Sequence, residues 1–161
     1  MAKKKATFGA GCFWGVEAAF RTLPGVSDAS VGYMGGEKRD PTYQDICTGT
    51  TGHAEVVEVE FSDDLVSFDD LLNLFWTIHD PTTPNRQGFD VGSQYRSAVF
   101  YHADEQRALA ETSIKKLEEN GRFEAPIVTE VTQAGPFYRA EEYHQRYMEK
   151  AGRVGQGFTC R

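Results

Sequence analysis

Apolar and polar residues follow two different periods along this chain, and each period predicts one kind of element. Within the predicted strand 53–61, residues 57–61 alternate and place Val57, Val59 and Phe61 on one side, which is typical of a half-buried strand. Residues 12–23 instead carry apolar side chains at helical spacing before a Pro-Gly stop. The chain therefore contains a helix and a strand that both have one apolar face to bury.

The same two periods predict the other elements. We expect strands at 4–9, 26–33, 97–101 and 127–131, and helices from Ser67 to about His79, from Asp104 to Gly121, and at 141–150. Two long polar loops, 35–52 and 81–95, interrupt this order. Interleaved strands and helices predict an α+β fold, a two-layer sandwich with a mixed sheet. We expect one catalytic domain over 1–161, with 152–161 as a mobile tail.

Composition narrows the possible partners. The chain has 161 residues and a formal net charge of −7, which argues against binding to nucleic acid or an anionic membrane. It starts without the apolar segment of a secretory signal and has no run of membrane-spanning length, so we expect a cytoplasmic protein. The three cysteines, Cys12, Cys47 and Cys160, are widely spaced and match neither a disulfide framework nor a zinc motif.

Cys12 follows a predicted strand and opens a predicted helix, inside the glycine-rich stretch 9–15. Unpaired N–H groups and the positive dipole end of a helix favour a thiolate over a thiol. The glycines leave room for a substrate, and Phe13 and Trp14 offer an aromatic wall for a methyl or thioether group. The alternative is a small buried cysteine in a glycine-rich turn.

Glu55 lies on the same side of its predicted strand as Val57. Burial of a carboxyl group without water raises its pKa, so Glu55 could donate a proton to a developing oxyanion. The alternative is that Glu55 lies past the buried part of the strand, in water.

Hydrogen-bond donors and the other two cysteines lie in the loops and the tail. Tyr43 and Tyr95, from separate loops, could hold one oxygen atom together, although each could also cap the core. Cys160, next to last in the chain, has the position of a resolving thiol; the alternative is a tail cysteine without a function. The position of Cys47 within the first loop favours a structural role. His144 could orient the tail or a ligand, or lie on a helix surface.

The motif at 11–15, Gly-Cys-Phe-Trp-Gly, resembles the signature of the A-type peptide methionine sulfoxide reductases. Similar stretches continue in order over about residues 5–148, at 32–33, 35–36, 41–43, 47–55, 79–82, 86–88, Asp90, 94–97 and 142–145. The tail differs from that of many members, and Phe89 replaces a common Asn before Asp90.

The resemblance implies a ferredoxin-like sandwich with extended loops and the reduction of the S epimer of methionine sulfoxide, free or in proteins. It implies Cys12 as nucleophile, forming a sulfenic acid, and Glu55 as the acid that protonates the sulfoxide oxygen. The other implied roles are oxygen binding by Tyr43 and Tyr95, and substrate binding by Phe13, Trp14 and Asp90. We further expect that His53 and His144 bind substrate and that Cys160 resolves the sulfenic acid.

The partners implied are the sulfoxide substrate and thioredoxin as reductant, with no metal or organic cofactor, and we expect a monomer. Two other functions remain possible. A thiol peroxidase would share the activated and resolving thiols, but needs no buried acid, aromatic pocket or tyrosine pair. A non-catalytic module that binds methionine sulfoxide would have no use for Cys12 together with Glu55.

Overall fold

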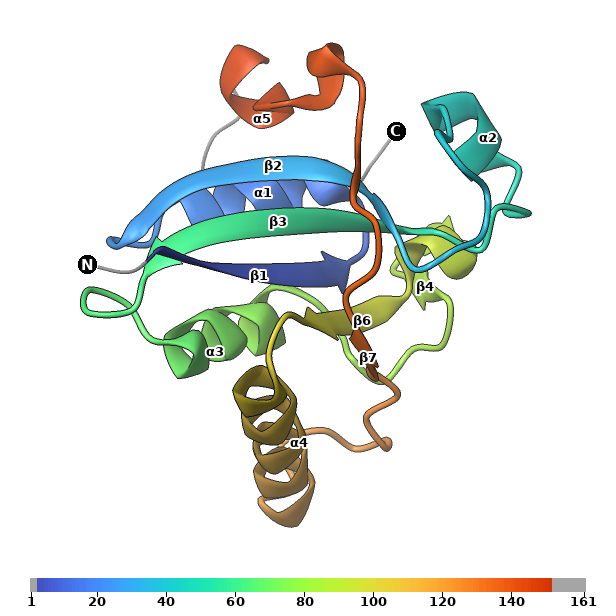
Figure 1. The fold of residues 1–161 in the computed structure, drawn as a ribbon. Coiled ribbons are helices and arrows are strands. Elements are labelled where there is room, and N and C mark those ends of the chain that lie inside the picture. The colour runs from blue at the N-terminus through green and yellow to red at the C-terminus, as the bar shows by residue number, and fades with distance from the viewer. Residues whose placement is uncertain (1–2, 152–161) are drawn as a thin grey trace.

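The computed structural model describes residues 3–151, and six strands in this part of the chain form one sheet in the order β7-β6-β1-β3-β2-β8 (Figure 1). Neighbouring strands are antiparallel except β6 and β7, so the sheet is mixed, as predicted. The strands are β1 (Lys3–Ala10), β2 (Val26–Met34), β3 (Ala54–Ser62), β6 (Ser97–Tyr101), β7 (Glu130–Gln133) and β8 (Tyr138–Arg139).

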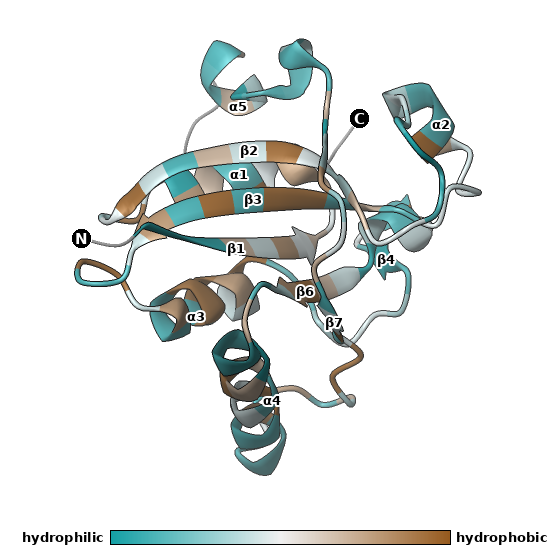
Figure 2. Ribbon diagram, viewed as in Figure 1, coloured by the Kyte–Doolittle hydropathy of each residue, from teal (hydrophilic) through white to brown (hydrophobic). Residues whose placement is uncertain are grey.

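Two helices complete the central unit. Helix α1 (Phe13–Arg21) connects β1 to β2, and α3 (Phe68–Ile78) connects β3 to β6. The resulting order β-α-β-β-α-β, with β6-β1-β3-β2 side by side, is that of a ferredoxin-like sandwich. The predicted fold class is therefore confirmed. Helix α4 (Asp104–Glu119) connects β6 to β7 and carries mostly polar residues (Figure 2).

The main core lies between the helices and one face of the sheet. Val57, Val59 and Phe61 of β3 are buried there, as their alternation predicts. The chain between β7 and β8 crosses the other face of the sheet near one end of the strands (Figure 1), and its Phe137 packs against a small second core there. A Cβ atom at Gly32 would lie 2.6 Å from the ring of Phe137, so this crossing requires a glycine in β2.

Four of the predicted elements differ from the structure. The first long loop contains α2 (Tyr43–Cys47), and the second contains β4 (Arg86–Gln87), β5 (Asp90–Val91) and the 3₁₀ turn η1 (Ser93–Tyr95). The strand predicted at 127–131 begins at Glu130, because the N–H of Val128 bonds to the carbonyl of Pro81 instead of to the sheet.

The helix predicted at 141–150 is wrong as a continuous element. It consists of the 3₁₀ turn η2 (Glu142–His144) and the short α5 (Tyr147–Lys150). Arg146 separates them in the left-handed conformation, with φ 55°. None of the helices in residues 3–151 combines the length and apolar character needed to cross a membrane.

Candidate active site

Cys12 lies at the N-terminal end of α1, where the chain turns out of β1. Gly11 adopts φ +96°, a conformation that favours glycine, and a Cβ there would lie 2.9 Å from the side chain of Gln87. Cys12 is the N-cap residue of α1, and its side chain does not cap the helix. Cys12 is therefore at the end of the helix where backbone N–H groups and the positive end of the dipole stabilise negative charge.

Glu55 lies beneath this helix end. Its side chain is 1% exposed, and Oε1 accepts a hydrogen bond from the N–H of Phe13, the residue after Cys12, at 3.3 Å. Burial raises the pKa of Glu55 to about 8; the Phe13 N–H opposes this rise, and the charge of Asp90 adds to it. The carboxyl group is thus mostly protonated near neutral pH. Its Oε2 atom has no hydrogen-bond partner among the described residues.

Tyr43 and Tyr95 share the electrostatic environment of Glu55. Burial raises the pKa of Tyr95 to about 12, and negative charge on Glu55 is the next largest cause. The same two causes, in the same order, raise the pKa of Tyr43. Both hydroxyls therefore keep their protons near neutral pH. The two loops bring them to one region, as oxygen binding by the pair requires.

An aromatic cluster surrounds the start of α1. The indole N–H of Trp14 donates to Nδ1 of His144 at 2.9 Å, and its ring stacks on Tyr147 with centroids 3.8 Å apart. The His144 ring also lies 5.3 Å from the ring of Phe13 and 4.4 Å from that of Tyr43. His144 therefore links the predicted methyl-binding wall to one of the predicted oxygen donors.

The protonation state of His144 is determined by these contacts. Because Nδ1 accepts the indole hydrogen, the proton of the neutral ring is on Nε2. Burial lowers the pKa of His144, which favours this neutral form. The residue is fully buried, not on a surface, and its Nε2 has no partner among residues 3–151.

The other predicted residues have different positions. His53 is buried and donates from Nε2 to the Lys38 carbonyl, while Nδ1 accepts from the N–H of Gly36. Both nitrogens thus hold the loop before α2, and contact of His53 with substrate stays a prediction. Cys47 is exposed at the end of α2, where its hydrogen bond and charge raise the pKa of Tyr43. Cys160 lies outside the described residues.

Glu141 is a supporting residue that the sequence analysis missed. Its carboxylate accepts from the N–H of Tyr43 at 2.9 Å and from the hydroxyl of Tyr33 at 3.0 Å. It therefore fixes the start of α2 and, with it, the position of Tyr43. No local pattern around Glu141 indicates these contacts, because both partners are about one hundred residues away in sequence. No group of three or more potential metal ligands occurs in residues 3–151.

Comparisons with known proteins agree with this geometry. The family model described as peptide methionine sulfoxide reductase matches residues 4–158. The peptide methionine sulfoxide reductase MsrA of Methanothermobacter thermautotrophicus is 65% identical over 147 residues, which cover 91% of this chain and 87% of that relative.

Solved structures give the same result. The crystal structure of Mxr1 from Saccharomyces cerevisiae in its reduced form is similar, with a TM-score of 0.86 and 36% identity, over 98% of this chain and 89% of that chain. Mxr1 in complex with Trx2 matches with a TM-score of 0.61 and 27% identity, over 90% of this chain and 84% of that chain. This chain belongs to the peptide methionine sulfoxide reductase family and is an enzyme that reduces methionine sulfoxide.

Proposed function

We propose that Cys12 attacks the sulfur of a methionine S-sulfoxide while Glu55 protonates its oxygen. The observation that carries this proposal is the bond from the Phe13 N–H to the buried Glu55 carboxyl, since it puts the acid beside the residue after Cys12. A raised pKa of about 8 keeps the proton on Glu55 near neutral pH.

The reaction balances without a further reactant. The Glu55 proton goes to the sulfoxide oxygen, which makes the substrate sulfur electrophilic enough for the Cys12 thiolate. The attack forms a bond between the Cys12 sulfur and the substrate sulfur. The S–O bond of the substrate then breaks as its OH group passes to the Cys12 sulfur, and the sulfur–sulfur bond breaks as methionine leaves. Cys12 is oxidised to a sulfenic acid, methionine sulfoxide is reduced, and Glu55 regains a proton from the solvent.

The surrounding side chains bind the two ends of the sulfoxide group. The hydroxyls of Tyr43 and Tyr95 donate to the oxygen, whose negative charge grows as the S–O bond breaks. Phe13 and Trp14 pack against the methyl group. Asp90, which is close enough to influence Glu55, contacts the polar part of the substrate.

His144 and His53 complete the predicted binding residues. The Nε2–H of His144 is a buried donor with no partner among the described residues, and such a donor is stabilised when a ligand oxygen accepts from it. His53 makes two hydrogen bonds to the backbone of the first loop. We assign it an indirect role in substrate binding, in which it holds this loop in place.

A second thiol then regenerates the enzyme. Cys160 attacks the Cys12 sulfenic acid, an S–S bond forms, and hydroxide leaves and becomes water after taking up a proton. Thioredoxin reduces the resulting disulfide. The structure of the yeast relative Mxr1 in complex with the thioredoxin Trx2 supports this choice of reductant. If Cys47 resolved the sulfenic acid instead, Cys47→Ser would stop turnover with thioredoxin and Cys160→Ser would not.

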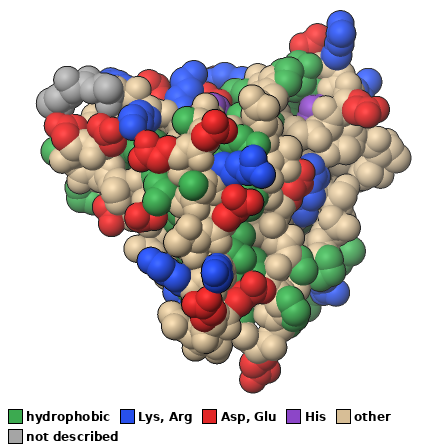
Figure 3. Space-filling model, turned by 60° about the horizontal axis from the view of Figure 1, so that its bottom comes forward, with side chains coloured by type: hydrophobic (Ala, Val, Ile, Leu, Met, Phe, Trp, Pro, Cys, Tyr) green, Lys and Arg blue, Asp and Glu red, His purple; other side chains and the backbone are tan. Residues whose placement is uncertain are grey.

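We expect the enzyme to act in the cytoplasm, together with its reductant and substrates, and to act as a monomer. Acidic and basic side chains are interspersed on the face shown in Figure 3, without a large patch of one sign. Such a surface suits an enzyme that repairs oxidised methionine in many different proteins better than one that binds a single charged polymer.

Glu55→Gln tests the proposal. The variant keeps the shape of the side chain and loses the proton, so we expect the rate of methionine formation to fall about a hundredfold or more. In the parent enzyme the rate should fall as pH rises through about 8, the pKa of Glu55. This fall should disappear in the variant.

Glu60→Gln is the matched control, since Glu60 is another carboxyl on the same strand and is only partly buried. It should keep the parent rate and the parent pH profile. If Glu55→Gln also kept both, another group would have to supply the proton and the proposed acid role would be wrong.

A further inference from the structure

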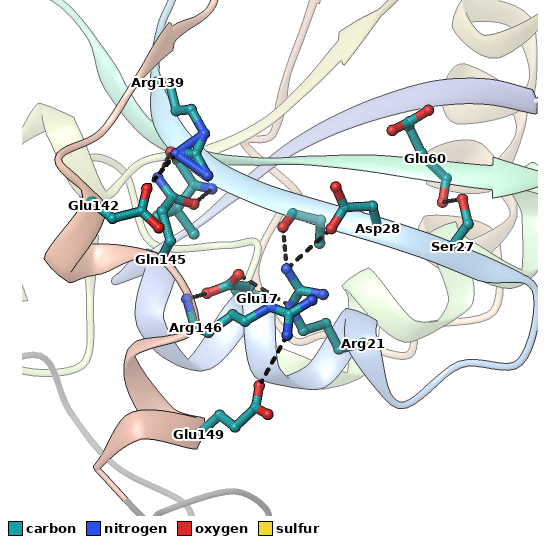
Figure 4. Close-up of polar contacts among 12 residues, drawn as sticks. Glu17, Arg21, Ser27, Asp28, Glu60, Arg139, Glu142, Gln145, Arg146 and Glu149 are labelled. Atoms are coloured by element: carbon teal, nitrogen blue, oxygen red, sulfur yellow. Dashed lines mark hydrogen bonds and ion pairs between the residues drawn. The ribbon is translucent and has the colours of Figure 1, made fainter.

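Glu17 is a buried carboxylate that the proposed chemistry does not use. It lies on α1, one turn after the start of the helix, and is 1% exposed. One of its oxygens accepts from Nε of Arg21 at 3.1 Å, and the other accepts from the backbone N–H of Arg146 at 2.8 Å (Figure 4). Burial raises the pKa of Glu17, whereas these two partners stabilise its charged form.

The Arg146 backbone has the left-handed conformation, which residues other than glycine rarely adopt. Such a conformation persists only where neighbouring contacts determine it. The side chain of Arg146 is exposed, and its ion pair with Glu149 is long, at 3.9 Å. The buried contact at this position is therefore the backbone bond to Glu17, not the arginine charge.

The residues on either side of Arg146 are also fixed. The side-chain amide of Gln145 accepts from the N–H of Val31 and donates to the carbonyl of the same residue, both at 2.9 Å. Tyr147 then begins α5 and stacks on Trp14. Gln145 therefore attaches the segment to β2, and Glu17 directs α5 onto α1.

The position of α5 determines the point from which the residues leading to Cys160 begin. Cys160 is nine residues after Ala151, the residue that comes directly after α5, and nine extended residues span at most about 30 Å. The rate at which a tethered thiol meets its target falls as the number of residues in the tether rises. Fixing α5 on α1, the helix that begins next to Cys12, keeps this link short.

We infer that Glu17 is a positioning residue for the resolving step: through the Arg146 turn it fixes α5 on α1 and so keeps Cys160 within a short reach of the Cys12 sulfenic acid. The inference rests on the proposed resolving role of Cys160. In that step the Cys160 sulfur forms a bond to the Cys12 sulfur, the S–OH bond breaks, and the hydroxide takes up a proton to become water. Glu17 takes part in no bond change.

Glu17→Met tests the inference, because methionine has a similar volume and no hydrogen-bond acceptor for Arg146. The reduced enzyme is mixed with methionine sulfoxide without reductant and quenched at intervals with a dione that traps sulfenic acid. The methionine formed reports the first step, and the trapped adduct reports the lifetime of the sulfenic acid. Loss of the Arg146 bond loosens α5, which Met148 and Tyr147 still pack against the core. In the limit of full release Gln145 is the last anchor, and the link lengthens to fifteen residues.

Loop-closure entropy then gives a sulfenic acid that lasts up to about twice as long. The rate of the first step should change by less than this lifetime does, since the stack of Tyr147 on Trp14 is the contact by which α5 reaches a proposed substrate-binding residue. Turnover with a small thiol, which reduces the sulfenic acid directly, should follow the rate of the first step. Glu17→Gln is the matched variant, since its amide oxygen can still accept from the Arg146 N–H, and it should restore the parent lifetime. An unchanged lifetime in folded Glu17→Met, or an equal slowing of both steps, would overturn the inference.

A second variant covers the case in which Glu17→Met fails to fold. A flexible Gly/Ser insertion of about sixteen residues after Ala151 leaves Glu17 in place and lengthens the link to about 25 residues. The loop-closure relation then gives a lifetime about five times longer. An unchanged lifetime would show that the starting point of the tail does not control the resolving step.

Cys160→Ser separates this inference from the function on which it rests. If the sulfenic acid of that variant decays as fast as in the parent, Cys160 is not the resolving thiol, and the proposed function fails at that point. If it persists in Cys160→Ser but is unaffected by Glu17→Met and by the insertion, only the positioning role of Glu17 is wrong.

Discussion

Helices α1 and α3 occupy equivalent places in the sandwich, yet their N-terminal ends are built differently. Helix α3 has a local capping box at its N-terminus: the Ser67 side chain accepts from the N–H of Asp70, and the Asp70 side chain accepts from the N–H of Ser67. Helix α1 has Cys12 at the same position and no such local cap. The N–H of Phe13 bonds instead to Glu55, forty-two residues away.

The N-terminal end of α3 is arranged for stability, whereas that of α1 is arranged for function. A capping box satisfies two backbone N–H groups with side chains from the same turn. At α1 no local side chain does this, and one N–H bonds to a buried acid next to Cys12. The end of α1 is thus less well stabilised by its own sequence, and that is the condition under which it can carry out chemistry.

The largest expected effect is that of Cys12→Ser. Serine is a better N-cap than cysteine, but its hydroxyl group does not ionise near neutral pH and cannot form a sulfenic acid. We expect no methionine formation above background, while the free energy of unfolding stays within about 1 kcal/mol of the reduced parent or rises. The measurements are methionine released per enzyme and urea unfolding under reducing conditions. Sustained turnover by this variant would remove the distinction between the two helix ends.

A smaller effect is expected for the stability of Glu55→Gln. The pKa of Glu55 rises from 4.5 to about 8 in the fold, so the folded state holds this proton more tightly than the unfolded state. The resulting loss of stability is absent below about pH 4.5, grows as pH rises, and is complete above about pH 8. Glutamine never ionises, so the variant should be more stable than the parent by on the order of a few kcal/mol at high pH.

Urea unfolding at about pH 5 and pH 9 measures this difference, with Glu60→Gln as the control. The stability gain of Glu55→Gln should be larger at the higher pH, and the effect of Glu60→Gln should be the same at both. A gain that is the same at both pH values would mean that burial does not raise the pKa of Glu55.

Local sequence signals account for the parts of the fold that were predicted. The alternation in β3 and the start of a helix at Ser67 are signals from residues close together in the chain, and both elements are confirmed. The position of Cys12 at the head of a helix also comes from local signals. The capping box of α2, in which Thr42 and Asp45 exchange bonds, was equally available and was missed within a polar loop.

Contacts between distant residues account for the parts that were not predicted. The helix expected at 141–150 is interrupted because Arg146 bonds to Glu17 and Gln145 bonds to Val31, more than one hundred residues away. The burial of His144 and its bond to Trp14 have the same origin. Periodicity contains no information about such pairs. The bond from Phe13 to Glu55 is another contact of this kind, and the catalytic roles of Cys12 and Glu55 were predicted from the resemblance to a known family.

The smallest expected effect comes from Ser67→Ala, which opens the end of α3. Removal of a serine N-cap leaves the N–H of Asp70 without its partner and should lower the free energy of unfolding by about 1 kcal/mol. Activity at a temperature well below unfolding should not change, because this helix end contacts none of the proposed catalytic groups. Urea unfolding and the rate of methionine formation provide the two readouts. A loss of activity without a loss of stability would contradict the view that one helix end holds the fold and the other performs the reaction.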